Sequence, residues 1–420
     1  MRRKTGPVLG RLLGLAVVTT LVVTMATLGG LPRSQAQAKT LVVGINLPLT
    51  GADAEDAELI KDGALLAIEE VNAKGGVAGY KIEPLILNDA TATAGQYDPA
   101  QAAVNAKKLV ATVGVVAAIG PQMSGSGKAM SPILSEGDLA IITPSSTNPD
   151  ITDPKFASTY RPQGKAVYFR TVTTDAYQGP NMANFFAEVL KVKSVYVLDD
   201  SGAYGVGIAD SFQKRALQKG IKVLGRDELN PKEADYTTIL TKIKGLNPDA
   251  LYYGGVEQAG SKLAKQAYDV IPKMPKGGGD GVYSANLLSG AGFPAAEGWY
   301  ATIASPHLLD NPEAQPWVDR FAKRWGKNPE DYSITSYDAA LVIFDAIKRV
   351  VASGKPVDKH TIRDAIQAAS LKTMQGTVSF DENGDLKTRV ISVFQIVHNM
   401  QFKDDDILHQ YKYIGVAPEN

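Results

Sequence analysis

The sequence predicts an α/β protein made of two Rossmann-like lobes, with several crossings of the chain between them. Three observations support this prediction. Short β-rich runs alternate with helical patterns, which is typical of parallel sheets flanked by helices. The alternation falls into two series of comparable length. The chain has 420 residues, 44% apolar and 21% charged, which suits two or more globular domains.

The first series begins with an apolar run at residues 40–47, which predicts a buried strand. A helix is expected over 58–74, where apolar residues recur at spacings of three and four before Gly75 and Gly76 end it. The same reasoning predicts the other elements of this series: strand 81–87, helix 100–112, strand 113–119, short helix 127–135 and strand 139–143.

The second series follows a strand at 168–172, and late helices and strands complete the chain. The predicted helices are 181–190, 206–219, 237–244, 260–270, 315–325, 336–352 and 361–369. The predicted strands are 194–198, 221–228, 250–253, 298–304, 377–380, 390–397 and 410–414. We expect residues 39–171 plus 304–383 to form an N-terminal lobe, and 172–303 plus 384–420 a C-terminal lobe.

The first 38 residues have the pattern of a signal peptide. Three basic residues at 2–4 precede an apolar run at 12–31, and Ala36-Gln37-Ala38 offers the small residues of a cleavage site. An uncleaved membrane anchor is the alternative, because about 20 apolar residues can span a bilayer. Cleavage removes five basic residues and no acidic ones, leaving 39 basic and 44 acidic residues. We therefore expect an exported, mildly acidic protein.

Composition excludes several kinds of chemistry. The chain has no cysteine, which removes disulfides, zinc–thiolate sites, cysteine nucleophiles and a cysteine lipid anchor. The chain has 44 basic and 44 acidic residues, so it has no excess of positive charge of the kind that nucleic-acid-binding proteins use. Residues 120–128 look like a phosphate loop, but Gln122 replaces its first glycine and Ala129 its magnesium-binding hydroxyl. No hydrolase or metal motif surrounds the four histidines. We expect no enzyme activity, no metal and no cofactor.

Small hydroxyl residues follow two neighbouring strands of the predicted first lobe. Ser124 and Ser126 come after strand 113–119, and Ser145, Ser146 and Thr147 come after strand 139–143. Ligands of open α/β sheets bind beyond the carboxyl ends of the strands, and hydroxyls beside a helix N-terminus suit a carboxylate. The same residues are also good caps and turns, so the residues alone leave both interpretations open.

Several motifs in collinear order resemble one known family over roughly residues 40–415. The motifs are 44–51, 63–64 with 67–77, 119–120 with Ser124, 142–147, 169–171, Asp175 with 178–179, Asp200 with 204–205, 235–236 with Leu240 and 243–244, 252–255, 337–340, and 380–381 with 384–385. Together they resemble periplasmic solute-binding proteins of the leucine/isoleucine/valine-binding type, the branched-chain amino acid ABC transporter family.

The resemblance implies a type I periplasmic-binding fold, with two lobes, three crossovers and a ligand cleft that closes on an amino acid. It implies that Ser124 and Thr147, with nearby backbone N–H groups, hold the α-carboxylate, and Ser146 belongs to the same candidate set. The Ser145 carbonyl, the Thr147 hydroxyl and a second-lobe acid would hold the α-ammonium. Tyr204 would close over the ligand. The family's usual glutamate falls on Asp280, which is one methylene shorter.

The side-chain pocket departs from the branched-chain pattern. Val256 stands where these binders place an aromatic residue, and Ser333 lies near another usual aromatic. Asp56 falls near a usual tyrosine, within a loop that also carries Asp53, Glu55 and Glu58. One interpretation is a solvated loop whose acids complement the next helix's positive end. The other is a pocket for a basic or polar side chain, to which Glu257 contributes.

The resemblance also predicts partners and location. The expected partners are a small amino acid and the membrane permease subunits of an ABC transporter, with no nucleic acid and a monomeric state. The expected location is the periplasm or extracytoplasmic space. A sensory subunit for a membrane receptor and a binder of small amides or urea are alternatives. An enzyme using the serine cluster is a further one, although no histidine or lysine motif is placed to activate a serine.

Overall fold

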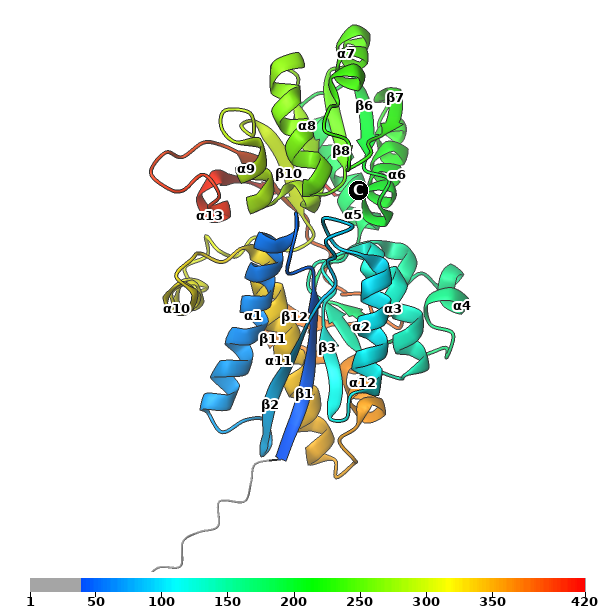
Figure 1. Cartoon of the computed structure of the whole chain (residues 1–420), viewed down its shortest axis with the longest axis vertical. Helices are drawn as coiled ribbons and strands as arrows, with labels where there is room; N and C mark the ends of the chain where they lie inside the picture. The colour runs from blue at the N-terminus through cyan, green and yellow to red at the C-terminus, as the bar shows by residue number, and fades with distance from the viewer. Residues whose placement is uncertain (1–38, 420) are drawn as a thin grey trace, which may run out of the picture. The chain divides into compact units, whose positions relative to one another are not determined.

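Two β-sheets organise the chain in the computed structural model, which describes residues 39–419 (Figure 1). The first sheet has five parallel strands in the order β2-β1-β3-β4-β5. Their bounds are β1 (Lys39–Leu47), β2 (Tyr80–Asn88), β3 (Val115–Ile119), β4 (Ile141–Thr143) and β5 (Tyr168–Arg170). The predicted signal peptide, residues 1–38, lies outside the described residues.

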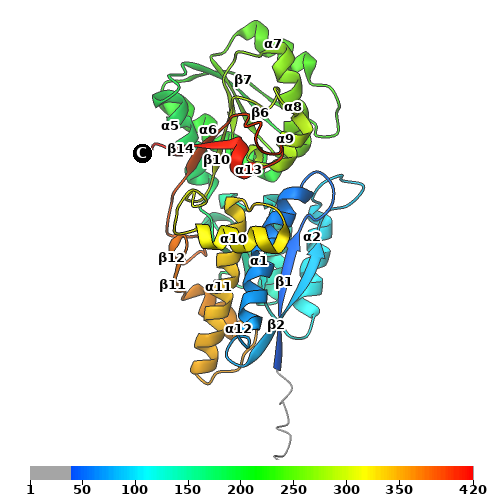
Figure 2. The same ribbon diagram turned by 90° about the vertical axis from the view of Figure 1, so that its left-hand side faces the viewer.

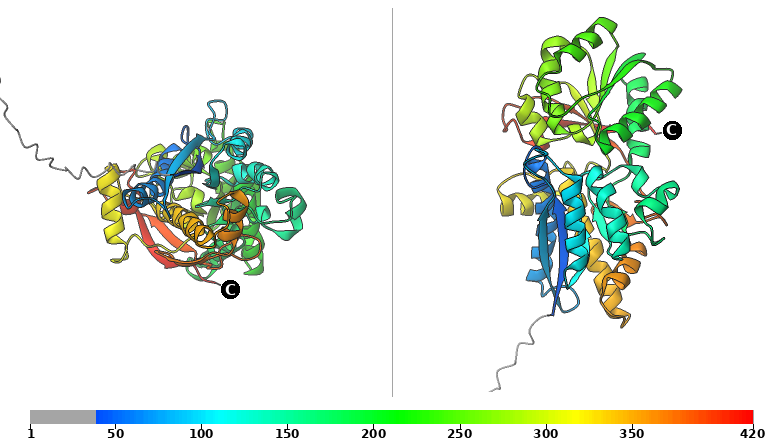
Figure 3. Two further views of the ribbon diagram at one scale, coloured as in Figure 1. Left: turned by 90° about the horizontal axis from the view of Figure 1, so that it is seen from below. Right: turned by 45° about the vertical axis from the view of Figure 1, so that its right-hand side comes forward.

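Helices cover both faces of the first sheet (Figure 3). They are α1 (Ala54–Ala73) and α11 (Asp331–Ala352), which pack against each other, and α2 (Pro99–Ala111) and α3 (Ser124–Glu136), which form a second pair. Side chains alternate between the two faces of a strand. Val43 therefore lies in the hydrophobic core on the side of α1 and α11, and Val42 packs against the separate core on the side of α2 and α3. A further helix, α12 (Lys359–Gln367), packs against α11 and β3.

The second sheet has seven strands in the order β14-β13-β10-β9-β8-β6-β7. Their bounds are β6 (Ser194–Asp199), β7 (Lys222–Glu228), β8 (Ala250–Gly254), β9 (Lys276–Gly278), β10 (Trp299–Ile303), β13 (Ser392–Ile396) and β14 (Tyr411–Val416). Strands β6 to β10 are parallel, and β13 and β14 add antiparallel neighbours at one edge. The parallel part repeats the first sheet's order, with its second strand at an edge and its first strand beside the third.

The two faces of the second sheet are covered by different helices, as two adjacent tyrosines of β8 show. Tyr252 contacts Phe186 of α5 (Asp175–Glu188) and stacks on Phe212 of α6 (Ala203–Gln218), with ring centroids 3.6 Å apart. Tyr253 lies instead beside Gly260. The helices on its side are α7 (Thr237–Leu246), α8 (Glu257–Val270) and α9 (Ala285–Ala291). The central strands are therefore enclosed from both sides, whereas the edge strands β7 and β14 are partly exposed.

The chain passes between the two sheets three times: after β5, after β10 and before β13. The second pass leads through α10 (Gln315–Trp325) to α11, which lies beside α1 (Figure 2). The remaining short elements are η1 (Pro149–Ile151), η2 (Pro154–Phe156), α4 (Ala157–Tyr160), η3 (Asp280–Val282), β11 (Ser370–Thr373), β12 (Gly376–Ser379) and α13 (Ile407–Gln410). No helix within residues 39–419 combines the length and apolar character needed to cross a bilayer.

The predicted α/β class with two lobes and three crossovers is confirmed, and each predicted helix and strand has a counterpart. The sequence prediction missed β9, β11, α4, α9 and α13, all of them short elements. It also began α3 at residue 127, whereas the helix begins at Ser124. The exact lobe boundaries stay a prediction.

Candidate functional site

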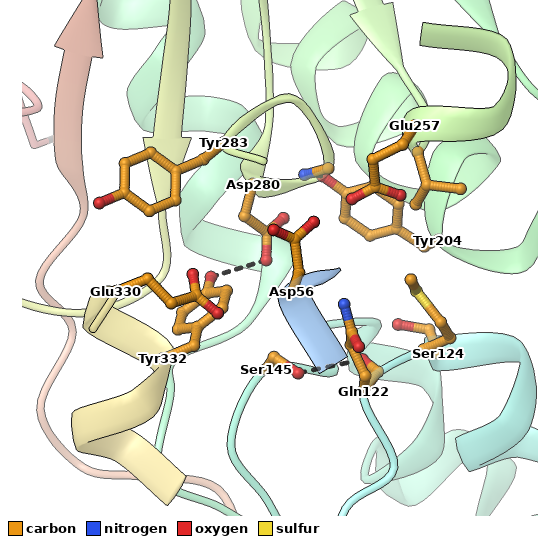
Figure 4. A pocket seen from close by; sticks show the side chains of 13 residues that line it. Asp56, Gln122, Ser124, Ser145, Tyr204, Glu257, Asp280, Tyr283, Glu330 and Tyr332 are labelled. Atoms are coloured by element: carbon orange, nitrogen blue, oxygen red, sulfur yellow. Dashed lines mark hydrogen bonds between the residues drawn. The ribbon is translucent and has the colours of Figure 1, made fainter. Parts of the chain in front are cut away.

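A small pocket of about 40 Å³ lies where loops from the carboxyl ends of both sheets meet (Figure 4). In each sheet the strand order reverses beside the first strand of its series, which is where open α/β sheets bind ligands. Six of the eight residues predicted to bind a ligand line the pocket: Asp56, Ser124, Ser145, Tyr204, Glu257 and Asp280. Seven further residues complete it: Gln122, Met123, Val256, Gly281, Tyr283, Glu330 and Tyr332.

Ser146 and Thr147, the other two predicted residues, are buried beside the pocket and do not line it. The Ser146 hydroxyl lies 3.2 Å from the Ser124 hydroxyl and donates to it. The Thr147 hydroxyl lies near the buried carboxyl of Asp175. Ser146 therefore positions a pocket residue, and Thr147 faces the second lobe's first helix.

Ser124 lies at the start of α3 and lines the pocket. Its oxygen accepts from the backbone N–H of Asn148 and from the Ser146 hydroxyl, each at 3.2 Å. A hydroxyl has two acceptor sites and one rotatable proton, so Ser124 can turn its proton toward an acceptor in the pocket while its oxygen accepts from the Asn148 N–H. The first-turn N–H groups of α3 lie at the same place and favour negative charge. This side of the pocket suits a carboxylate.

Arg170 fixes the loop that carries Ser145 and Ser146. Its side chain is completely buried, and its guanidinium donates to the Ser146 and Asn148 carbonyl oxygens, the latter at 2.7 Å. A salt bridge of 2.8 Å to Asp385 balances its charge. A planar guanidinium with five donors holds several acceptors in fixed geometry, so the loop is preorganised.

Asp280 stands on the second sheet's side of the pocket, directly after β9. One carboxylate oxygen accepts from the Tyr332 hydroxyl at 2.7 Å and the other from the Gln178 amide, also at 2.7 Å. Burial raises the pKa of Asp280, and the hydrogen bonds from Tyr204, Tyr332 and Gln178 oppose that rise. These donors favour the charged form of Asp280. The carboxylate is therefore held in place to bind a cationic group.

A second buried carboxyl, that of Asp175, lies behind Asp280 at the start of α5. Neither of its oxygens has a hydrogen-bond partner within the described residues. Burial raises its pKa well above the usual range, and the nearby Asp280 charge raises it further. The two carboxyls therefore compete for ionisation, and a cation beside them relieves both.

The aromatic residues of the pocket come from both sides: Tyr204 and Tyr283 from the second sheet, and Tyr332 from α11 of the first. The Tyr204 oxygen accepts from the Gly281 N–H at 3.0 Å, which fixes the ring beside the loop that carries Asp280. Tyr204 comes from the start of α6 and its side chain is buried. This position fits the closing role predicted for it from the resemblance.

Asp56 and Asp53 are not part of a solvated loop, so that interpretation is wrong for both. The Asp56 carboxylate accepts from the Ser284 hydroxyl at 2.6 Å and the Ala285 N–H at 3.0 Å. Asp53 accepts from the Tyr97 N–H at 2.7 Å. Both side chains are buried at the start of α1, whereas Glu55 is exposed.

Two glutamates complete the acidic surroundings of the pocket. Glu257 begins α8 and Glu330 immediately precedes α11, and both are buried. One carboxylate oxygen of each has no hydrogen-bond partner within the described residues. Burial is the largest cause that raises their pKa well above the usual range, and the neighbouring Asp56 charge adds to it in both cases.

Glu330 and Tyr332 were missed by sequence reasoning, although Ser333 had been singled out nearby. Ser333 is buried in α11 and does not line the pocket; its hydroxyl accepts from the Glu330 N–H at 3.2 Å. No usual capping signal marks this helix start in the sequence, because Glu330 and Ser333 reverse the order of the common Ser/Thr-x-x-Glu capping box.

A profile of the family described as "Periplasmic binding protein" matches residues 40–401. The chain belongs to this periplasmic binding protein family. The match spans every strand of both sheets except β14, all three crossovers and every pocket residue named above. The periplasmic binding protein fold expected from the sequence motifs is thereby confirmed.

Individual relatives of this periplasmic binding protein agree with the assignment. The leucine-, isoleucine-, valine-, threonine- and alanine-binding protein of Pseudomonas aeruginosa is 32% identical over 359 residues, which are 85% of this chain and 90% of that protein. The leucine-binding protein LivK of Thermotoga maritima has a TM-score of 0.76 and 26% identity, over 90% of this chain and 98% of that one.

A second similar structure shows the shared fold. It is the branched-chain amino acid transporter substrate-binding protein LivJ of Streptococcus pneumoniae in complex with isoleucine. Its TM-score is 0.75 at 22% identity, and the alignment covers 90% of this chain and all of the other. The architecture of two lobes is therefore common to this chain and to structures of substrate-binding proteins.

Proposed function

We propose that this protein is the extracytoplasmic substrate-binding protein of an ABC transporter, and that it binds an amino acid in the pocket between its two sheets. The α-carboxylate meets the Ser124 hydroxyl, Ser145 and the N-terminus of α3. The α-ammonium meets Asp280. The observation that carries the proposal is the opposition of neutral donors on one side and a buried, hydrogen-bonded carboxylate on the other.

Closure follows from the cost of burying charge. A zwitterion leaves water at little cost only when both of its charges meet fixed partners. Those partners come from different sheets, so only the closed arrangement offers both, and ligand shifts the population toward it. Asp56 and Ser284 hydrogen bond across the same junction at 2.6 Å. The protein acts by binding and release rather than by turnover, and the permease subunits of the transporter are its partners.

The direct test is calorimetry of the purified protein with L-amino acids, their D-enantiomers, and analogues that lack either the carboxylate or the ammonium. We expect one or more L-amino acids to bind and both kinds of analogue to lose at least about thirtyfold in affinity, since an unpaired buried charge costs about 2–5 kcal/mol. Analogues that bind as tightly as the parent amino acid contradict the proposal.

Substitution of Asp280 tests the ammonium contact separately. Asp280→Asn keeps the size of the side chain and removes its charge, and we expect at least about thirtyfold weaker binding of the best amino acid. Glu297→Gln is the matched control, because Glu297 is an exposed acid of the same sheet region. Equal affinities for Asp280→Asn and the unsubstituted protein remove Asp280 from the site.

A further inference from the structure

The pocket holds more carboxyl groups than an ordinary zwitterion needs. Four carboxyl groups line it, those of Asp56, Glu257, Asp280 and Glu330, and they point toward its middle (Figure 4). All four are buried or enclosed by pocket residues, and no lysine, arginine or histidine is among the thirteen lining residues. One ammonium group neutralises one of these carboxylates and leaves the other three facing the ligand's side chain.

Two of the remaining carboxyls have acceptor atoms that the protein leaves unused. Glu257 Oε2 and Glu330 Oε1 have no hydrogen-bond partner within residues 39–419, although the two side chains are only 4% and 1% exposed. Buried acceptors without donors are costly. A ligand that brings N–H donors to this place satisfies them, and an aliphatic side chain does not.

The same carboxyls are placed so that they can carry charge. Asp56 lies in the first turn of α1, Glu257 begins α8, and Glu330 precedes the first turn of α11. The positive end of a helix dipole stabilises a carboxylate there. The Asp53 carboxyl lies close to those of Asp56 and Glu257 and belongs to the same acidic cluster.

We infer that the side-chain end of this pocket, formed by Asp56, Glu257 and Glu330, selects an amino acid whose side chain carries a second cationic group. An ammonium has three donors and a guanidinium five, which matches the unused oxygens of Glu257 and Glu330. This inference rests on the proposed function, because Asp280 and the Ser124 hydroxyl are needed for the α-amino acid part of the ligand. It replaces the aliphatic preference that the names of the relatives would suggest.

Matched ligand pairs test the inference. Lysine and norleucine have similar shapes and differ in the terminal ammonium, and arginine and citrulline differ in the guanidinium charge. We expect lysine, ornithine or arginine to bind at least about thirtyfold more tightly than its neutral counterpart, as sites built around buried polar groups discriminate strongly. Norleucine, citrulline or leucine binding as tightly as the cationic amino acids overturns the inference and leaves the proposed function intact.

The variant Glu257→Gln links the selectivity to this cluster. We expect the ratio of lysine to norleucine affinity to fall at least about tenfold while norleucine affinity stays within about threefold. A purely structural role would lower both affinities together, and that result overturns the inference. Glu330→Gln provides a second variant from the other sheet's side of the pocket, with the same expectation.

Two further probes separate the inference from the proposed function. Cadaverine is lysine without its α-carboxylate, and cadaverine binding as tight as lysine binding contradicts the proposed function. Calcium ions are the third probe, because clustered carboxylates also attract divalent cations. Tight calcium binding that lysine cannot displace overturns the inference, and failure of every amino acid to bind overturns both proposals.

Discussion

At the scale of single residues, Arg170 links the packing of the first sheet to the geometry of the pocket. It lies at the end of β5 and is fully buried, and its guanidinium holds two carbonyl oxygens of the serine loop together with Asp385. A lysine can replace the charge but has no fork of donors. The residue therefore contributes shape as much as charge to the site.

We expect Arg170→Lys to lower the free energy of unfolding by about 2–4 kcal/mol, since lysine keeps the charge but cannot make the guanidinium's buried hydrogen bonds to the Ser146 and Asn148 carbonyl oxygens. Urea unfolding followed by circular dichroism measures this loss. Arg324→Lys is the control, because Arg324 pairs with Glu69 on the surface, and we expect less than about 1 kcal/mol there. Similar losses in both variants would show that the Arg170 network contributes little.

At the scale of elements, α1 and α11 approach each other closely enough to set the distance between two pocket acids. Gly63 of α1 lies against the backbone of Ser333, and a Cβ at this position would stand 2.1 Å from the Ser333 carbonyl oxygen. Only glycine permits this contact without moving a helix. Asp56 and Glu330 extend from the same two helices, so their placement depends on Gly63.

We expect Gly63→Ala to lower the free energy of unfolding by about 1–3 kcal/mol, as overpacking of a close helix contact does. Gly245→Ala is the matched control: Gly245 lies in α7 with open space around it, and alanine there leaves stability unchanged or raises it by up to about 1 kcal/mol. Denaturant titration of both variants distinguishes crowding from helix propensity, and a loss in Gly245→Ala alone contradicts the expectation.

The periodic parts of the chain were predictable, and the parts held together by distant partners were not. The strands β1 and β8 are continuous apolar runs, and α10 was predicted at its observed bounds because its apolar and charged residues alternate at helical spacing. By contrast, β9 is a three-residue strand, Lys276–Gly278, whose place is fixed by pairing with β8 and β10. No local pattern carries that information.

The pocket residues also differ in whether a local sequence pattern could predict them. Ser124 and Ser145 were predicted from their positions after strands, and the structure brings them to one pocket. Glu330 and Tyr332 enter through a helix that starts more than 180 residues later in the chain, so only the crossover reveals them. The burial of Asp56 was also hidden in the sequence, because its partner Ser284 is 228 residues away.

At the scale of the whole molecule, buried carboxyls make stability depend on pH. Burial raises the pKa of Asp53 to about 7, and the facing groups Asp89, Asp56, Glu257 and Tyr97 are acids or a hydrogen-bond donor, with no cation among them. Burial likewise raises the pKa of Asp89, Asp200 and Asp338 to about 6. The folded chain thus holds protons that the unfolded chain releases above its ordinary carboxyl pKa of about 4.

Stability without ligand is therefore expected to fall as pH rises from 5 to 8, because the folded state binds more protons than the unfolded state in that window. His307 acts in the same direction, since its carboxylate partners raise its pKa against the effect of burial. Urea unfolding at both pH values measures the fall. In Asp53→Asn we expect this fall to be smaller than in the unsubstituted protein by about 2 kcal/mol. Two results contradict this account: no fall in the stability of the unsubstituted protein, or a fall in Asp53→Asn that is steeper than in the unsubstituted protein.

The distribution of the pocket's acidic residues over the two sheets also affects which form of the protein meets the transporter. Asp56 and Glu330 belong to helices of one sheet, and Glu257 and Asp280 follow strands of the other. Bringing them together without cargo means either mutual repulsion or proton uptake, so the empty closed form carries a free-energy cost that a cationic cargo removes. The transporter would then meet chiefly loaded carriers, and few docking events would be wasted on empty ones.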